Sequence, residues 1–66
     1  MQETRLMRET EARAYLGHMS HGTFFQLRRQ GVIPTIKVGA AAYFDRYDLD
    51  VAIERLRAQQ GEDGGQ

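Results

Sequence analysis

Residues 20–39, with the sequence SHGTFFQLRRQGVIPTIKVG, decide the fold of this chain of 66 residues. Ser20 suits the N-cap of a helix, because its hydroxyl can accept a hydrogen bond from a free backbone N–H one turn further on. Phe24 and Leu27 lie three residues apart and therefore share one helical face. This spacing predicts a helix over residues 20–30.

The second half of the stretch predicts a hairpin. Gly31 ends the helix, and residues 32–38 are typical of a strand that Pro34 confines to a sheet edge or a bend. Residues 39–42 are the expected hairpin tip, and residues 43–44 are the expected return strand.

A second face of the helix carries side chains that are unusual for a surface exposed to water. His21, Phe25 and Arg29 lie four residues apart, and Gly22 and Gln26 lie beside them. This face offers rings, an amide and a guanidinium, but no carboxylate. Such groups suit the edges of DNA bases. We therefore expect this helix to lie against DNA while the rest of the chain holds it there.

A further helix is expected before this stretch. Residues 9–16 have apolar side chains at the spacing of a buried stripe, namely Ala12, Tyr15, Leu16 and, just beyond them, Met19. Gly17 suits the left-handed residue that ends a helix, so a tight turn should join the two helices in a helix-turn-helix pattern. Leu6 and Met7 are expected to anchor the N-terminus on the core.

The last helix is expected over residues 45–59. Asp45 suits its N-cap, and its buried stripe comprises Leu49, Ala52, Ile53 and Leu56. The predicted fold class is α+β, a small winged helix-turn-helix domain over residues 1–59 with a two-stranded hairpin as the wing. Residues 60–66, rich in glycine and acidic, are expected to be a disordered tail.

Length and composition limit the classes of protein to which the chain can belong. Sixty-six residues form one domain, near the lower size at which a single core is sufficient. The absence of cysteine excludes disulfides and thiolate metal ligands. No apolar run approaches the roughly 18 residues of a membrane span, and no signal peptide is visible. A cytoplasmic protein without membrane contact is therefore expected.

Residues that perform catalysis or bind metals form no convincing group. His18 and His21 straddle a turn without a nearby cysteine or carboxylate partner, which disfavours a zinc site. Asp45, Asp48 and Asp50 form an acidic cluster, but Asp48 fits the first turn of the last helix, and so small a domain has little room for a catalytic cleft. We expect neither enzymatic activity nor a metal or other cofactor.

Charge is distributed unevenly along the chain, although the net charge is zero. Residues 12–44 contain no acid and have a charge of +4, from Arg13, Arg28, Arg29 and Lys37. The flanks contain all nine acids and sum to −4. A basic centre acts on a phosphate backbone within a Debye length of roughly 8–10 Å. The alternative is a chance asymmetry on a solvated surface.

The order of these elements resembles that of the small winged-helix proteins of the excisionase and MerR-like group. The resemblance covers roughly residues 6–56 and rests on Leu6-Met7, Ala12, Tyr15-Leu16-Gly17, Ser20 with Thr23, Gly31-Val32-Ile33-Pro34, Val38-Gly39, Tyr43 and Asp48-Leu49. It implies a protein of a phage, prophage or mobile element that bends or marks DNA for a recombinase, or represses a promoter.

Two places depart from the pattern of that group. The hairpin tip, residues 39–42, is Gly-Ala-Ala-Ala where the group usually has Arg or Lys. We therefore expect weak DNA contact by the wing, which Lys37 and Arg46 partly replace. Arg8 occupies the cap position of the first helix, where many relatives have Thr or Ser, and is itself suited to meet a phosphate.

The chemistry of the DNA grooves assigns roles to the candidate residues. Gln26 is expected to bond an adenine edge and Arg29 to bond guanine O6 and N7, each good bidentate pair discriminating by about 1–3 kcal/mol. Phe25 is expected to contact a thymine methyl group or a sugar. The predicted phosphate contacts that set the register are Thr23, Arg28 and Lys37. The set is completed by Ser20, His21 and Arg46.

Each assignment has a structural alternative. Thr23 can bond its own helix backbone, and Arg28 can lay its stem over the core. Phe25 can be buried against the wing. Gln26 and Arg29 can form an ordinary solvated face.

Three functions follow from these observations. The favoured one is an accessory factor of site-specific recombination that binds double-stranded DNA and acts with an integrase. The second is a small transcriptional regulator of the same fold, and the third is a protein-interaction module. The chain lacks the heptads of a coiled coil after Leu56, so we expect monomers that bind adjacent sites cooperatively, head to tail.

Overall fold

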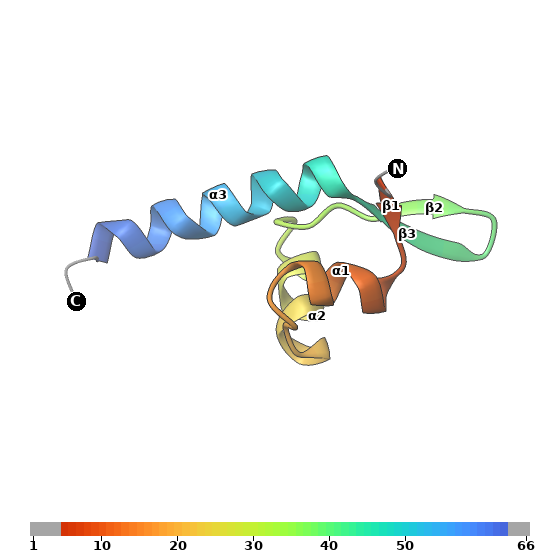
Figure 1. Cartoon of the computed structure of the whole chain (residues 1–66), viewed down its shortest axis with the longest axis horizontal. Coiled ribbons are helices and arrows are strands. Elements are labelled where there is room, and N and C mark those ends of the chain that lie inside the picture. The colour runs from red at the N-terminus through yellow and green to blue at the C-terminus, as the bar shows by residue number, and fades with distance from the viewer. Residues whose placement is uncertain (1–4, 64–66) are drawn as a thin grey trace.

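The computed structural model describes residues 5–63, with side chains as far as Gln60. Three helices and a three-stranded antiparallel sheet form an α+β domain (Figure 1). In chain order the elements are β1 (Leu6–Met7), α1 (Glu9–Tyr15), α2 (His21–Arg29), β2 (Ile36–Val38), β3 (Ala41–Asp45) and α3 (Arg46–Asp63). This arrangement is compatible with a winged-helix-like fold.

The sheet has the order β1-β3-β2, so the return strand of the hairpin is central. Leu6 pairs with Asp45 and Met7 with Phe44. The prediction that both residues anchor the N-terminus on the core is confirmed for Met7, which is buried, and wrong for Leu6, which is exposed. Their pairing as a third strand was not predicted, because two residues are too few to show an alternating pattern.

The hairpin turn is shorter than predicted. Val38 pairs with Ala41, which leaves Gly39 and Ala40 as a two-residue turn. Gly39 has φ +62°, a conformation that glycine adopts without strain. A glycine first in a two-residue turn is typical of type II′. The predicted tip over residues 39–42 and return strand over residues 43–44 are therefore wrong in extent, since β3 already begins at Ala41.

The first half of the predicted strand over residues 32–38 is also not a strand. Val32 and Ile33 donate their backbone N–H groups to the carbonyl of Leu27, at 3.0 and 3.4 Å, and so close the C-terminus of α2. Gly31, with φ +81°, makes this reversal accessible. Both side chains are buried, so their apolar character reflects the core rather than a strand.

A single core lies between the sheet and the helices. Phe24 of α2 and Phe44 of β3 meet edge to face, with ring centroids 5.0 Å apart. The other buried side chains are Met7, Ala12, Leu27, Val32, Ile33, Leu49 and Ala52, with Leu16, Met19 and Leu56 packed against them. The predicted sharing of a buried face by Phe24 and Leu27 is confirmed.

Tyr15 corrects the predicted stripe of the first helix. It is exposed, and its hydroxyl donates to Asp50 at 2.6 Å, so it links α1 to α3 at the surface. The helix itself ends at Tyr15 rather than at residue 16.

The last helix is longer than predicted. Asp45 accepts the backbone N–H of Tyr47 at 3.0 Å, as expected of a residue that caps the helix. The helix continues to Asp63, so residues 60–63 are helical rather than disordered, and residues 64–66 lie outside the described part of the chain. The second half of α3 extends past α1 and α2 (Figure 1). No helix in residues 5–63 is long and apolar enough to cross a membrane.

Candidate nucleic-acid interface

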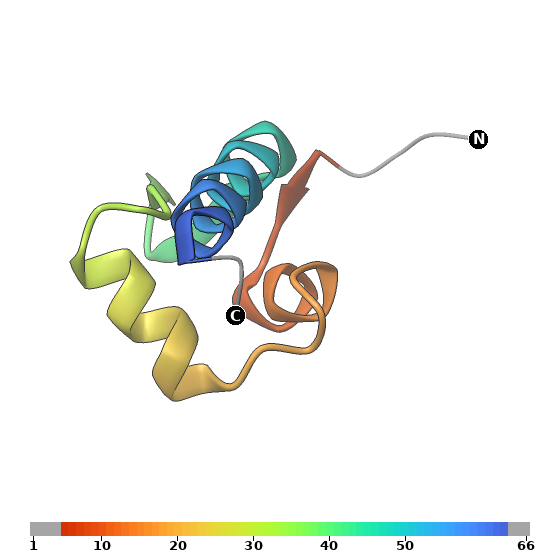
Figure 2. The ribbon, with the colours of Figure 1, turned by 90° about the vertical axis from the view of Figure 1, so that its left-hand side faces the viewer.

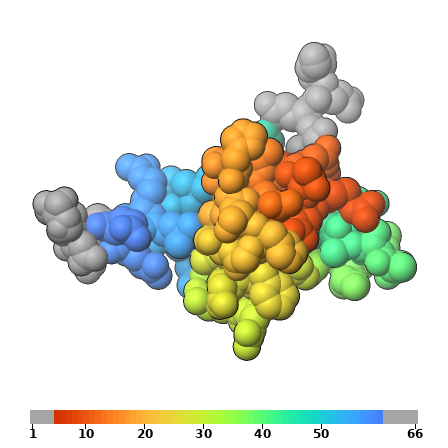
Figure 3. Space-filling model, turned by 90° about the horizontal axis from the view of Figure 1, so that it is seen from below, coloured from red at the N-terminus to blue at the C-terminus, as the bar shows by residue number. Residues whose placement is uncertain are grey.

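The helix α2 stands at the opposite side of the molecule from α3. In Figure 2 the two helices are separated, with α1 beside them. In the space-filling view of Figure 3, α1 and α2 form the centre of one face and the hairpin lies at its side. Of the two helices on this face, α2 contains no acid, whereas α1 carries Glu9 and Glu11 in its first turn.

The start of α2 is fixed by its first residues. Ser20 Oγ accepts the backbone N–H of Thr23 at 3.2 Å and donates to Thr23 Oγ1 at 3.0 Å. This confirms the predicted cap. The Thr23 hydroxyl thus bonds the side chain of the cap residue rather than the helix backbone that the structural alternative named. Thr23 is exposed, and its contact with phosphate stays a prediction.

Two polar side chains on the outward face of α2 have no protein partner. Gln26 and Arg29 are exposed, and no hydrogen bond or ion pair within the described part of the chain engages either side chain. Gly22 lies on the same face, and a Cβ added there would meet nothing within 4 Å. The face is therefore open, polar and without a carboxylate of its own.

Phe25 lies exposed on this face rather than buried against the hairpin. Its exposed fraction is 45%. The ring of His21 stacks on it, with centroids 6.3 Å apart and planes inclined by 17°. The alternative that Phe25 is buried is thus wrong.

A carboxylate from α1 holds His21. Glu9 contacts His21 Nδ1 through its Oε2 atom, and the same oxygen lies 3.3 Å from Arg13 Nε. Arg13 also donates to the carbonyl of Met19 in the turn at 3.4 Å. We call Glu9, Arg13, His21 and Phe25 the α1–α2 cluster. The expectation that His21 lacks a nearby carboxylate partner is therefore wrong. The cluster was not predictable, because residues that pair across two helices have no fixed spacing in the sequence.

Arg28 faces the hairpin. It is half-buried, donates from Nε to Thr35 Oγ1 at 3.1 Å, and its guanidinium carbon lies 5.2 Å from the centroid of the Phe44 ring. This geometry matches the alternative that its stem lies over the core. Its contact with phosphate stays a prediction.

The hairpin presents few charges. Lys37 is exposed, opposite Ala42 in the β2–β3 register, and has no ion pair among the side chains that the structure describes. Arg46 is half-buried and engaged by other groups. Near the base of the hairpin, the guanidinium of Arg8 lies 5.2 Å from the centroid of the Tyr43 ring. The Arg8 backbone N–H donates to Glu11 at 3.2 Å, which supplies the capping interaction that the arginine itself does not provide.

The acids that would oppose a phosphate backbone are largely engaged. Arg5 forms two hydrogen bonds with Asp45, at 2.9 and 3.2 Å. These bonds, followed by the N–H of Tyr47, hold the pKa of Asp45 below its usual value. On α3, Asp50 accepts from the hydroxyl of Tyr15 at 2.6 Å, and Glu54 lies 3.7 Å from Arg57.

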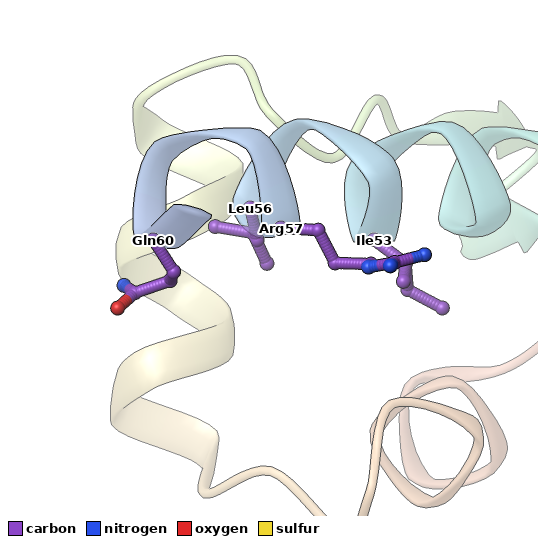
Figure 4. Close-up of a pocket in the computed structure, with 4 residues that line it drawn as sticks. All are labelled: Ile53, Leu56, Arg57 and Gln60. Atoms are coloured by element: carbon purple, nitrogen blue, oxygen red, sulfur yellow. The ribbon is translucent and has the colours of Figure 1, made fainter. Parts of the chain in front are cut away.

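Within the described residues, no group of three or more histidine, cysteine or acidic side chains is placed to hold a metal ion. An open, mainly apolar hollow of about 500 Å³ lies below the second half of α3, lined by Ile53, Leu56, Arg57 and Gln60 (Figure 4). It is distinct from the outward face of α2.

No protein-family model, curated protein or solved structure matches this chain. The resemblance to the excisionase and MerR-like group consequently rests on the order of motifs and on an architecture compatible with it.

Proposed function

We propose that this chain is a sequence-specific DNA-binding protein of the winged helix-turn-helix type that places α2 in the major groove. The observation on which this depends most is the outward face of α2. Gln26 and Arg29 project from it without any described protein partner, and the helix contains no acid. Groups so placed can bond base edges without first breaking an intramolecular contact.

Discrimination between sequences is assigned to these two side chains. Gln26 bonds the N6 and N7 atoms of adenine, and Arg29 bonds O6 and N7 of guanine. Their separation by three residues places them on neighbouring turns of α2. Phe25, the member of the α1–α2 cluster that is exposed beside them, contacts an apolar group of the DNA.

Phosphate contacts set the register of the helix in the groove. Lys37 and Thr23 are exposed and accessible to the backbone. Arg8 and Arg28 attract the phosphate backbone through their charge. The guanidinium group of each also lies over an aromatic ring. Only some three to five phosphates are contacted, so the slope of log K against log salt is modest, near −0.9 per contact.

The biological role that we favour is an accessory factor for recombination in a phage or mobile element, acting in the cytoplasm together with an integrase. The motif order that resembles excisionases supports this role, and so does the small size of the domain. Copies bind adjacent sites head to tail. A small transcriptional regulator would use the same helix on a promoter, so the location of the preferred site separates the two roles.

The test is a binding titration on DNA fragments from the chain's own genomic neighbourhood and on random DNA, at two salt concentrations. We expect selective, salt-sensitive binding that Gln26→Ala and Arg29→Ala each weaken on the selected site. Arg55→Ala is the matched control, because it removes the same charge from an exposed position on α3. Equal losses for Arg29→Ala and Arg55→Ala would refute the placement of α2.

Absence of binding to every fragment at low salt would sink the proposal. The protein-interaction module would then be the remaining reading, and Gln26 and Arg29 would be tested against protein partners.

A further inference from the structure

We propose that Phe25 recognises the 5-methyl group of a pyrimidine in the major groove, and that Glu9 and His21 position its ring for this contact. The inference rests on the proposed function and specifies the chemical group that the site selects. It begins from an anomaly, a large aromatic side chain with 45% exposure on a face that is otherwise polar.

Exposure of Phe25 is not the result of a loose side chain. The ring of His21 stacks on it, one helical turn earlier, at 6.3 Å. His21 in turn contacts Glu9, whose carboxylate lies 3.3 Å from Arg13. The ring of Phe25 is therefore supported from one side and open on the other.

The chemistry of the major groove limits what this open side can meet. Base edges there present hydrogen-bond donors and acceptors, and the only apolar group on an unmodified base is the 5-methyl of thymine. A 5-methylcytosine presents the same group at the same position. A phenyl ring gains from covering a methyl group and gains little from a donor or an acceptor. The methyl is therefore the group that Phe25 selects.

The residues beside Phe25 allow DNA to approach the outward face of α2 closely. Gly22 leaves its side of the face open, with nothing within 4 Å of an added Cβ. Gln26 and Arg29 supply the polar bonds to the adjacent base pairs. The methyl-bearing pyrimidine is accordingly expected within the selected site, next to the bases that these two residues contact.

The experiment starts from the selected DNA site and replaces each thymine, one at a time, by deoxyuridine, which removes only the methyl group. For the wild-type chain, one position should lose affinity by about fourfold, the factor expected from burying one methyl group. Phe25→Ala should bind both DNAs equally. Glu9→Gln should reduce the ratio between them while leaving the salt slope unchanged. Val51→Ala, which shortens an exposed apolar side chain on α3, is the matched control and should keep the full ratio.

A second arm distinguishes the two sources of the methyl group. Cytosine in place of the sensitive thymine is compared with 5-methylcytosine. A fourfold gain on methylation identifies the methyl group itself as the ligand, whereas sensitivity at thymine alone restricts the contact to thymine.

Each result has a defined meaning. The inference is overturned if a selected site exists and no deoxyuridine lowers affinity, or if Phe25→Ala keeps the wild-type ratio. Phe25→Leu retains an apolar side chain and is the control for a folding defect in Phe25→Ala. Thermal unfolding of each variant verifies the fold. If no site is selected from any DNA, the proposed function fails as well, which is a different outcome from selection without methyl sensitivity.

Discussion

At Gly22, stability of the helix and binding of DNA are expected to favour different residues. Glycine inside a helix is less favourable than alanine by roughly 0.5–1 kcal/mol. At this exposed position a methyl group would meet nothing within 4 Å in the free protein. Nothing in the described fold therefore requires glycine here, and under the proposed function the role of Gly22 is to let DNA approach α2 closely.

The variant Gly22→Ala should be more stable and bind DNA more weakly. The gain in helix propensity should raise the melting temperature by about 2–8 °C. The added methyl should lower affinity for the selected site about fivefold or more, as overpacking costs about 1 kcal/mol or more. Thermal unfolding and a binding titration measure both effects, with random DNA as the control. Unchanged or higher specific affinity would remove α2 from close contact with the bases.

Asp45 makes stability depend on pH. Its pKa is lowered in the folded chain, chiefly by the hydrogen bonds from Arg5 and then by the N–H of Tyr47. The stabilisation is therefore fully present above the carboxyl pKa of the unfolded chain, about 3.9, and is lost as the pH falls through the lower folded value.

Asp45→Asn should therefore be less stable than wild type at pH 7, with a difference that shrinks below about pH 4. Asparagine retains the ability to cap α3, so the variant removes mainly the charge. Urea unfolding across pH 2–7 measures the difference. A difference that stays constant over this range would mean that the Arg5 contact contributes no charge-dependent stability.

The sequence predicted single residues well where one short-range rule acts. Ser20 caps α2 because its hydroxyl reaches only its own helix, and Phe24 is buried because helical spacing fixes its face. Tyr15 and the α1–α2 cluster were not predictable in this way. Their partners depend on the angle between helices, which no local spacing encodes.

Among the elements, the hairpin is the one whose length could not be predicted from the sequence. Ala40, Ala41 and Ala42 have no strong turn or strand preference, so the register could not be read from them. The positive φ of Gly39 fixes a two-residue turn and brings Ala41 into β3. The predicted hairpin was therefore right in kind but wrong in length.

The uncharged turn of the hairpin can be tested by adding a charge. Ala40→Arg should strengthen DNA binding at low salt and steepen the salt slope by about 0.9, the effect of one added phosphate contact. The fold should be unaffected, because Ala40 is exposed. Ala58→Arg adds the same charge at an exposed position on α3 and serves as the control. An equal change in slope for both variants would contradict a location of the hairpin near DNA.

At the scale of the whole molecule, one small core holds both the helix and the hairpin in place. Ile33 is 1% exposed in the irregular segment that connects them. The sequence identified its apolar character and misassigned its conformation, because burial of an irregular segment and burial of a strand require the same residue types.

Ile33→Val should lower the free energy of unfolding by about 0.5–1.5 kcal/mol, through loss of one buried methyl group and the small cavity left behind. Chemical denaturation gives the value, and Val51→Ala, on the exposed side of α3, is the control with little effect. A loss no larger than that of the control would show that the core relaxes around Ile33. The salt slope on DNA should not change, since the variant removes no charge.

The extension of α3 past the core also has a consequence for local opening. Leu49 and Ala52 are buried, Leu56 touches the core only in part, and no later residue of the described side chains belongs to it. Backbone amides should therefore exchange hydrogen for deuterium at graded rates along this one helix, slowest around Ala52 and fastest towards Gln60. The first half of this helix should therefore open only when the whole domain unfolds, whereas its second half should open locally, without global unfolding.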